Sequence, residues 1–229
     1  MKTLTLILAE TPLEPVPREL WSHPSVYRHA RRRGKPPRAI LLDAAMHHQA
    51  MKRLPGREHR GRPDIAHVTL LTVLDSPLCR KDMCRILVHT ASDYLIEVDP
   101  ATRLPRNYLR FTGLMEQLFE EGAVPPRSER PLLALTRESL TGLIEKYHPL
   151  ALLPGHGREA SLTTITHLAA SRAAILLPTT PRATPTPRLL DAAARGELEA
   201  YNARGLEDVE PWTLASRLLC RIEAATSLI

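Results

Sequence analysis

A short run of arginines ahead of a carboxylate is the first arrangement in this sequence with an evident chemical use. The run contains Arg57, Arg60 and Arg62, and Asp64 follows two positions after the last of them. Guanidinium groups bind phosphate through forked hydrogen bonds, and a carboxylate beside a bound nucleic acid can accept a proton. The run therefore favours a site that holds a polyanion.

A second group of arginines lies further along the chain. Arg103, Arg106 and Arg110 are three or four positions apart, and Tyr108 stands between the last two. If a helix begins near Asn107, Arg106 and Arg110 share one of its faces. This spacing fits an RNA backbone, with the arginines on phosphates and Tyr108 stacked on a base. The alternative is that both arginine groups form a salt-bridge network with the aspartates of the same half of the chain: Asp43, Asp64 and Asp75.

The composition agrees with a polyanionic partner but does not require one. The chain has 229 residues and a formal charge of +6, and 26 of its 31 basic residues are arginine. An arginine-rich basic chain favours nucleic acid as the partner. A GC-rich genome or a hot environment would give the same bias. The hydrophobic share of 43% excludes a chain that is disordered throughout.

Cysteines, histidines and apolar runs exclude several other classes of protein. Three cysteines are too few for a disulfide framework, and we expect Cys79 and Cys84 to be buried free thiols. His47 and His48 are adjacent, so on a helix they point about 100° apart and do not form a metal pair. We expect His67 to be a core imidazole and the protein to hold no metal. No stretch approaches the ~18 apolar residues of a membrane span, so we expect a soluble cytoplasmic protein without a membrane partner.

Strands alternate with helices along the chain, which predicts an α/β sheet that is largely parallel in its second half. The expected strands are residues 3–9, 39–42, 84–90, 94–98, 131–135, 150–153, 173–177 and 197–201. The expected helices are residues 44–54, 64–75, 107–121, 137–147, 161–170, 188–195 and 212–225. Residues 11–37 read as a connection rich in proline and arginine, and a change of composition near 121–130 hints at a boundary.

Ligands of open α/β sheets bind beyond the carboxyl ends of the strands. The loops after Leu153, Leu177 and Tyr201 offer small or polar residues there: Gly155, Gly157, Thr179, Thr180, Asn202 and Gly205. The sequence contains neither GxxxxGK[ST] nor GxGxxG, which argues against a phosphate-cradling nucleotide site. Gly155 and Gly157 could equally belong to an ordinary tight turn.

Four stretches, taken in order, resemble the Nep/Emg family. They are LLDAAMHHQAM at 41–51, RGRPDIAH at 60–67, LDSP at 74–77 and TRLPRNYLRF at 102–111. Members of that family are SPOUT-class methyltransferases that modify N1 of a pseudouridine in small-subunit rRNA during ribosome assembly. The resemblance is dense over residues 40–120, and chance does not explain two long motifs in this order.

The resemblance implies a fold and partners. It implies one SPOUT methyltransferase domain over residues 1–229, with helices on both faces of the sheet and a C-terminal trefoil knot. It implies a homodimer that binds rRNA and holds S-adenosylmethionine in the knot and cofactor region, residues 150–229. Residues 11–37 would be a basic insert.

The resemblance also implies site residues. Asp64 would be the catalytic base, oriented by Arg62, although Asp64 could instead cap the helix at Ile65 or simply pair with Arg62. The residues that would bind RNA are Arg60, Arg62, Arg103, Arg106, Arg110 and Tyr108. The residues that would bind the cofactor are Leu153, Gly155, Leu177, Pro178, Thr179, Tyr201, Leu206, Trp212 and Thr213.

Two features depart from the family pattern. Residues 176–181 stand where the family has a glycine-rich loop, but they contain no glycine, and the acidic stretch 207–211 interrupts the last motif. These features favour a non-catalytic rRNA-binding assembly factor with a degenerate cofactor site, whereas the intact RGRPD favours the enzyme. A methyltransferase with a shifted RNA target, reached through residues 11–37, is a third possibility.

Overall fold

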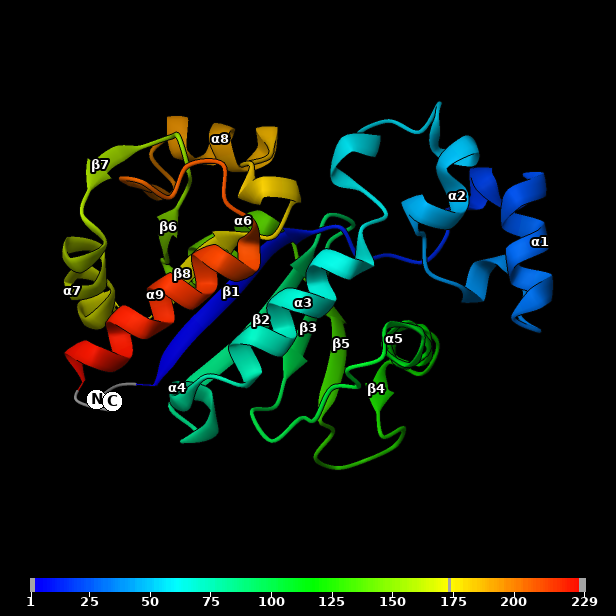
Figure 1. Cartoon of the computed structure of the whole chain (residues 1–229), viewed down its shortest axis with the longest axis horizontal. Helices are drawn as coiled ribbons and strands as arrows, with labels where there is room; N and C mark the ends of the chain where they lie inside the picture. Colours follow the sequence, from blue (N-terminus) through cyan, green and yellow to red (C-terminus); the bar gives the residue numbers. More distant parts are fainter. Residues whose placement is uncertain (1–2, 173, 227–229) are drawn as a thin grey trace.

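A mixed β-sheet forms the centre of the structure (Figure 1). The computed structural model describes residues 3–172 and 174–226, and within them the sheet has nine strands in the order β4-β5-β3-β2-β1-β8-β6-β9-β7. From β2 to β7 in this order the strands are parallel, whereas β3, β5 and β4 pair antiparallel. The strands are β1 (Leu4–Thr11), β2 (Cys84–Thr90), β3 (Tyr94–Val98), β4 (Ala123–Val124), β5 (Leu133–Arg137), β6 (Leu150–Leu152), β7 (Arg158–Ala160), β8 (Ala174–Pro178) and β9 (Glu199–Ala203).

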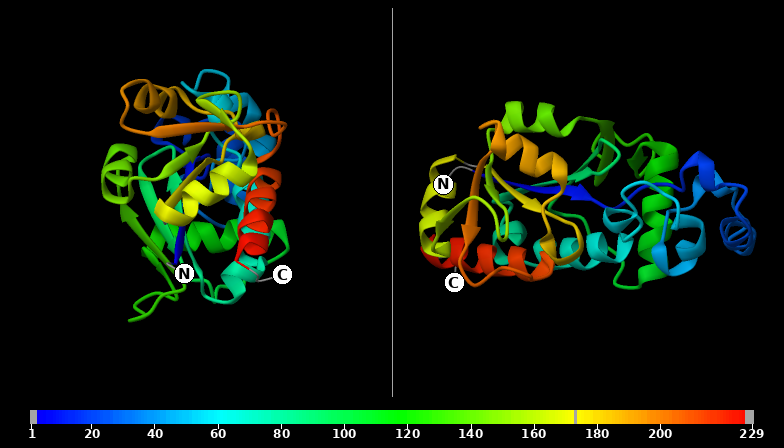
Figure 2. Two further views of the ribbon diagram at one scale, coloured as in Figure 1. Left: turned by 90° about the vertical axis from the view of Figure 1, so that its left-hand side faces the viewer. Right: turned by 90° about the horizontal axis from the view of Figure 1, so that it is seen from above.

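Helices cover both faces of this sheet (Figures 1 and 2). In β1, Leu6 and Leu8 face the core under α3, α5 and α9, whereas Ile7 and Ala9 face the core under α6 and α8. Successive strand residues point to opposite faces, so a strand buried on both sides reads as one apolar run. The α/β prediction with helices on both faces is confirmed. The helices are α1 (Pro24–Arg32), α2 (Ala44–Met51), α3 (Pro63–Leu74), α4 (Pro77–Arg80), α5 (Tyr108–Glu121), α6 (Leu140–Tyr147), α7 (Leu162–Arg172), α8 (Pro187–Ala194) and α9 (Pro211–Ala225).

The elements with clear local signals lie where the sequence predicts them. The hairpin of β2 and β3 is present, and β6, β8 and β9 are parallel. The side chain of Asn107 caps α5, and Gly122 ends that helix with a φ of 78°. Residue 173, the first of one predicted strand, lies outside the described residues.

Two predictions about the N-terminal region are wrong. The apolar run 39–42 is not a strand, because a 3-10 turn (Pro37–Ala39) leads into it and Leu41 makes only an isolated bridge with Pro15. Residues 11–37 are not only a connection, since they contain α1. Pro24 at the first turn and the capping side chain of His23 start that helix inside a proline-rich stretch.

Helices α1 and α2 form a small unit beside the sheet, at one end of the molecule (Figure 2). We call it the α1–α2 module. The carboxylate of Glu116 on α5, only 3% exposed, joins the module to the rest of the chain. It accepts hydrogen bonds from Arg33 and Lys35 at 2.8 and 2.9 Å. A buried carboxylate between two cations is costly to break on one side only.

The change of composition near 121–130 does not separate two sheets. Strand β4 pairs with β5, and β5 pairs with β3, so both sides of this stretch belong to the same sheet. Among the described helices, none has both the length and the apolar character needed to cross a bilayer.

Candidate active site

The first turns of α2 and α5 meet at the proposed RNA side of the site. Asp43 caps α2 through the backbone N–H of Ala45 at 2.9 Å. Its other carboxylate oxygen accepts a 2.6 Å hydrogen bond from the hydroxyl of Tyr108 on α5. Burial, and then this hydrogen bond, raises the pKa of Tyr108 well above its usual value. The phenol therefore stays protonated and ties the two helices together.

Arg62 and Asp64 form a forked ion pair at the start of α3. Arg62 donates from Nε to Asp64 Oδ1 at 2.9 Å and from Nη2 to Oδ2 at 2.7 Å, and this hydrogen bonding raises the pKa of Arg62. The side chain of Asp64 is 47% exposed. The fork fixes the orientation of the carboxylate without burying it. The pairing alternative for Asp64 is thus present in the structure, and it leaves the carboxylate accessible.

Gly61 lets the loop before α3 pass close to the module. Its φ is 64°, and a Cβ there would lie 2.9 Å from the Met51 side chain and 3.1 Å from that of Leu42. Only glycine combines this left-handed backbone with this close approach. The backbone N–H of Arg62 then donates to the carbonyl oxygen of Pro12, which follows β1.

The arginines of the first group are largely engaged within the protein. Arg60 makes a fork to Glu14, which is 5% exposed, with distances of 2.7 and 2.6 Å. Its guanidinium is therefore held by a buried carboxylate. Glu14 was not among the predicted partners, so the Arg62–Asp64 pair is the part of the predicted salt-bridge network that the described residues contain.

The arginines of the second group face solvent. Arg103, Arg106 and Arg110 are exposed, and the Arg103 side chain donates to two backbone carbonyl oxygens, at 3.4 and 3.5 Å. Within residues 3–172 and 174–226, Arg106 and Arg110 make no side-chain hydrogen bond or ion pair. His67 holds the loop in front of them, because its Nε2 lies 2.7 Å from the carbonyl oxygen of Pro105. His67 is 5% exposed, as expected for a core imidazole.

The predicted cofactor residues lie in or after the neighbouring parallel strands β6, β8 and β9 and at the start of α9. The N–H of Leu153, after β6, donates to Tyr201 O in β9 at 2.8 Å. The N–H of Gly155 donates to the side chain of Asn202 at 3.0 Å. Leu177, Pro178 and Thr179 end or follow β8, next to β6. Three further predicted cofactor residues are half-buried. Leu206 lies in the loop after β9, and Trp212 and Thr213 lie in the first turn of α9.

Asn202 and Glu207 hold the third loop, although neither belongs to the predicted cofactor set. Besides Gly155, Asn202 contacts Glu207, to which its Nδ2 donates at 3.2 Å. Glu207 also accepts from the N–H of Gly205 at 2.9 Å. Its own backbone N–H first, then Asn202 and Gly205, lower the pKa of Glu207. The acidic stretch 207–211, which interrupts the family motif, thus helps to form the turn after β9. Its position directly after a predicted strand was the sequence signal that could have indicated this role.

The loops leave room for a bound molecule at two glycines. Gly155 and Gly205 have φ values of 74° and 81°, and a Cβ on either would meet no atom within 4 Å. The lack of a side chain lets a ligand approach the backbone there, although both N–H groups already donate within the protein, to Asn202 and Glu207. Arg182 N donates to Glu210 Oε2 at 3.3 Å and links the second loop to the third.

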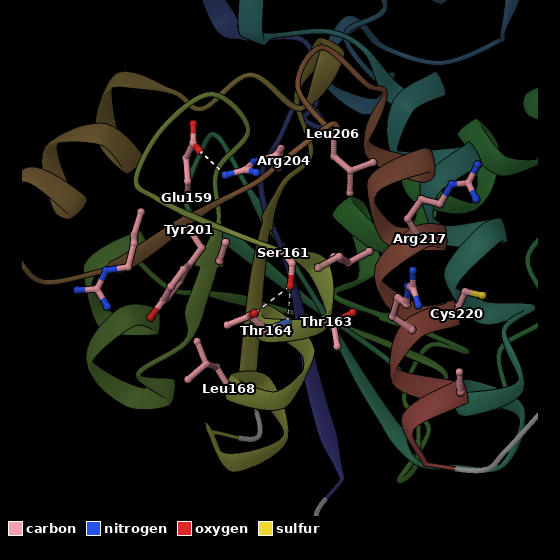
Figure 3. A pocket seen from close by; sticks show the side chains of 15 residues that line it. Glu159, Ser161, Thr163, Thr164, Leu168, Tyr201, Arg204, Leu206, Arg217 and Cys220 are labelled. Carbon is pink, nitrogen blue, oxygen red and sulfur yellow. Dashed lines mark hydrogen bonds and ion pairs between the residues drawn. The ribbon is translucent and has the colours of Figure 1, made fainter.

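A cavity of about 1100 Å3 lies beside these loops, between α7 and α9 (Figure 3). Of the predicted cofactor residues, Tyr201 and Leu206 line it. The polar side chains that line the cavity include Arg204 and Glu159, which form an ion pair at 3.2 Å. The cavity therefore adjoins the loop cluster and overlaps it only in part. In the described part of the chain, no group of three or more His, Cys, Asp or Glu side chains is arranged to hold a metal.

A family model described as EMG1/NEP1 methyltransferase matches residues 6–223. The chain belongs to this family. The EMG1/NEP1 relatives include the ribosomal RNA small subunit methyltransferase Nep1 of Staphylothermus marinus, 49% identical over 158 residues, which are 68% of this chain and 69% of the relative. The Nep1 of Aeropyrum pernix is 38% identical over 224 residues, covering 98% and 99% of the two chains.

A solved EMG1/NEP1 structure has the same fold. The crystal structure of Archaeoglobus fulgidus Nep1 bound to S-adenosylhomocysteine matches this chain with a TM-score of 0.84 and 34% identity. The match covers 98% of this chain and 99% of that one. Both halves of the site described above therefore fall within the matched region.

Proposed function

We propose that this protein is an S-adenosylmethionine-dependent methyltransferase that modifies N1 of a pseudouridine in small-subunit rRNA during ribosome biogenesis. The observation that carries the proposal is the Arg62–Asp64 fork, which presents a half-exposed carboxylate beside solvent-facing arginines. Family membership and the full-length likeness to an S-adenosylhomocysteine-bound Nep1 support the reaction class.

The cofactor would bind across the loops after β6, β8 and β9. The open space beside Gly155 and Gly205 leaves room for such a ligand, and we assign Gly155 to this site with the other eight predicted cofactor residues. S-adenosylmethionine supplies an electrophilic methyl group on sulfur when it is bound. The residues in the assignment are Leu153, Gly155, Leu177, Pro178, Thr179, Tyr201, Leu206, Trp212 and Thr213.

The rRNA would bind over the start of α5 and α3. Arg103, Arg106 and Arg110 have no acidic partner among the described residues, so their guanidinium groups are available to phosphates. Arg60 and Tyr108 are held by Glu14 and Asp43, so they would shape the RNA-binding surface rather than bind phosphate directly.

The roles of Asp64 and Arg62 follow from the chemistry of the base. Pseudouridine carries a proton on N1, whereas N1 of uridine is bonded to the sugar. Methyl transfer to N1 requires that this proton leave, and an oriented carboxylate within reach can accept it. The fork from Arg62 would hold the half-exposed Asp64 carboxylate in a fixed orientation, and the target base would have to be extruded from its RNA loop to reach it.

We also propose the finer architecture that the family resemblance implies: one domain over residues 1–229, a trefoil-knotted path in residues 150–229, and a homodimer. The contact between Arg182 and Glu210 supports close passage of the two loops in the proposed knot. A groove of about 450 Å3 between α3 and α9, which includes Leu71 and Leu219, supports a paired face. Light scattering should give the mass of two chains, and a single-chain mass would contradict the dimer.

A matched pair of RNA hairpins tests the function. One carries pseudouridine at the target position and the other carries uridine in the same sequence. With S-adenosylmethionine, we expect nucleoside mass spectrometry to find one added methyl group on the pseudouridine base only. Methylation of the uridine hairpin, or of a ribose, would contradict the proposed specificity.

The loss of glycine from the second loop keeps one alternative open, a non-catalytic rRNA-binding assembly factor. Arg182 and Ala183 have positive φ values of 55° and 47°. This loop therefore has the left-handed backbone conformation that glycine favours, at two residues that are not glycine. Calorimetry with S-adenosylhomocysteine separates the two functions. Binding supports the methyltransferase, whereas RNA binding without cofactor binding supports the assembly factor.

A further inference from the structure

A buried ionic cluster lies under the 178–187 loop, outside the residues assigned so far. Its centre is Glu10, near the end of β1 and 2% exposed. Thr186 donates to Glu10 Oε2 at 3.0 Å, and Arg188 Nη1 donates to Glu10 Oε1 at 3.2 Å. Arg188 Nη2 also donates to Asp93, in the turn between β2 and β3, at 2.7 Å. One side chain of α8 therefore connects β1 with the turn between β2 and β3.

Keeping Glu10 ionised in this place costs free energy, because burial raises its pKa. The buried ring of His89 lies against the same carboxylate, with its Nδ1 3.5 Å from Glu10 Oε1, and its Nε2 contacts Asp93 at 3.1 Å. Apolar residues of similar volume would often give equal or greater stability than a buried ion pair. Stability alone is therefore a poor reason for this cluster.

The loop above the cluster has a strained backbone. Arg182 and Ala183 both occupy the left-handed region, with φ values of 55° and 47°, and neither is glycine. Ala183 is fully buried, and its N–H donates to the carbonyl oxygen of Thr180 at 2.9 Å. Residues persist in such conformations only where the surrounding structure holds them there.

Both ends of the loop are attached to the end of β1. At the start, Thr179 N donates to the carbonyl oxygen of Ala9 at 2.8 Å. At the end, Thr186 and Arg188 bind the side chain of the next residue, Glu10. Two adjacent residues of one central strand thus fix the span over which the loop must bend.

We propose that Glu10 and Arg188 are positioning residues for S-adenosylmethionine, which hold the strained 178–187 loop in the shape that binds the cofactor. They touch neither the cofactor nor the RNA in this arrangement. The inference rests on the proposed function, which assigns Leu177, Pro178 and Thr179 to the cofactor site.

Glu10→Gln and Arg188→Met test the two sides of the contact. Each variant removes a hydrogen bond to a charged group, so the Kd for S-adenosylhomocysteine and the KM for S-adenosylmethionine should rise about tenfold or more. The value of kcat at saturating cofactor and the Kd for RNA should stay within about twofold of the wild type. Arg188 is half-exposed, so its variant should fold even if Glu10→Gln does not.

Arg195→Ala is the matched control. Arg195 follows the same helix and forms a forked pair with Glu197, but it has no contact with the 178–187 loop among the described residues. Its loss should leave both cofactor constants unchanged. If Arg195→Ala weakened the cofactor as much as Arg188→Met, a general effect on α8 would replace the positioning role.

A second substitution examines the strain itself. Ala183→Gly permits the left-handed backbone at no steric cost, so it should recover part of the lost cofactor affinity in the Glu10→Gln background. The recovery should exceed any gain in the wild-type background, which a double-mutant cycle measures. Equal effects in both backgrounds would overturn the link between the anchor and the strain.

Calorimetry on the wild type separates the two proposals. If the unmodified protein does not bind S-adenosylhomocysteine, the proposed function fails and takes this inference with it. If the wild type binds and both Glu10→Gln and Arg188→Met bind equally well, the proposed function stands and the positioning role is overturned. A drop in kcat at unchanged KM would also overturn it, because the residues would then act on the chemical step.

Discussion

Asp64 combines two properties that a positioned base needs. The fork from Arg62 fixes the direction of its carboxylate, and about half of its side chain stays exposed. Asp43, a second carboxylate near Arg62, is already occupied by the hydroxyl of Tyr108 and by the N-terminus of α2. Of these two carboxylates, Asp64 is therefore the more accessible one, and it could accept a proton from N1 of a bound nucleobase.

Asp64→Asn tests this assignment. An amide cannot accept the N1 proton, so we expect kcat to fall about a hundredfold or more while the Kd for RNA changes little. Single-turnover methylation and RNA binding are measured on the same preparation. Asp75→Asn is the control, because Asp75 follows the other end of α3 and pairs with Arg80 in solvent. Normal turnover by Asp64→Asn would remove Asp64 from the role of base.

Arg106→Ala tests the proposed RNA-binding surface at the start of α5. Arg106 has no acidic partner among the described residues, so a phosphate contact is its expected use. Its loss should weaken binding and reduce the slope of log K against log salt by about 0.7–0.9, the change for one phosphate contact. Arg130→Ala, an exposed arginine between β4 and β5, should leave the slope as it is. An unchanged slope for Arg106→Ala would show that Arg106 does not contact an RNA phosphate.

The helices place these residues by their N-termini. Asp43 caps α2, Asp64 lies in the first turn of α3, and Asn107 caps α5. A helix N-terminus carries a partial positive charge, which favours anions in its first turn. The contacts of Tyr108 with Asp43 and of His67 with the loop before α5 bring these starts together, so an RNA phosphate would meet several favourable dipoles.

The contact between α1 and α2 should respond to pH. His29 Nδ1 lies 2.9 Å from His47 Nε2, and burial first, then His29, lowers the pKa of His47 to about 4. Its value in the unfolded chain is 6.5, so the unfolded state binds the proton more readily between these values. The stabilising effect of neutral His47 is complete above pH 6.5 and is lost as the pH falls toward 4.

We therefore expect the free energy of unfolding to fall by about 2 kcal/mol from pH 7 to pH 4 through this pair, allowing for solvent screening. Urea unfolding at a series of pH values measures the fall. His47→Asn should reduce the slope, whereas the exposed His48→Asn should not. Equal slopes for wild type and His47→Asn would contradict the role of this pair.

Local signals made part of this structure predictable. Asp43, Asn107 and Gly122 mark helix ends by their chemistry, and the RGRPD motif locates the Arg62–Asp64 pair from adjacent residues. Contacts between distant residues gave no such signal: Glu14 meets Arg60 46 positions away, and Glu10 meets Arg188 178 positions away. Helix α1 was missed because prolines, which act here as helix starters, dominate the composition of residues 11–37.

The central strand joins the two halves of the proposed site. Near its end, Ala9 O and the Glu10 side chain hold the 178–187 loop, while Pro12 O and Glu14 hold Arg62 and Arg60. Residues 9–14 therefore link the proposed cofactor loops to the loop that carries Arg60 and Arg62. A displacement at either end would be transmitted through a few bonds of one strand, and this geometry favours a molecule that unfolds as one unit.

The fluorescence of the two tryptophans can test whether the molecule unfolds as one unit. Trp21 lies by the α1–α2 module and donates to Val16 O at 2.8 Å, and Trp212 lies in the first turn of α9, among the proposed cofactor residues. Trp21→Phe leaves Trp212 as the reporter beside the proposed cofactor loops, and Trp212→Phe leaves Trp21 as the reporter beside the α1–α2 module. A ligand that binds only the folded state stabilises it by about 2.7 kcal/mol at one hundred times its Kd.

With S-adenosylhomocysteine set relative to the Kd of each variant, both reporters should therefore show one transition, raised by roughly 5–10 °C. The Trp21 signal must move although its indole is remote from the cofactor loops, because the sheet, Glu14 and Glu116 connect the module to the rest of the chain. If the ligand moved only the Trp212 transition, the module would be a separate folding unit. The single domain proposed over residues 1–229 would then have to be divided beside α5.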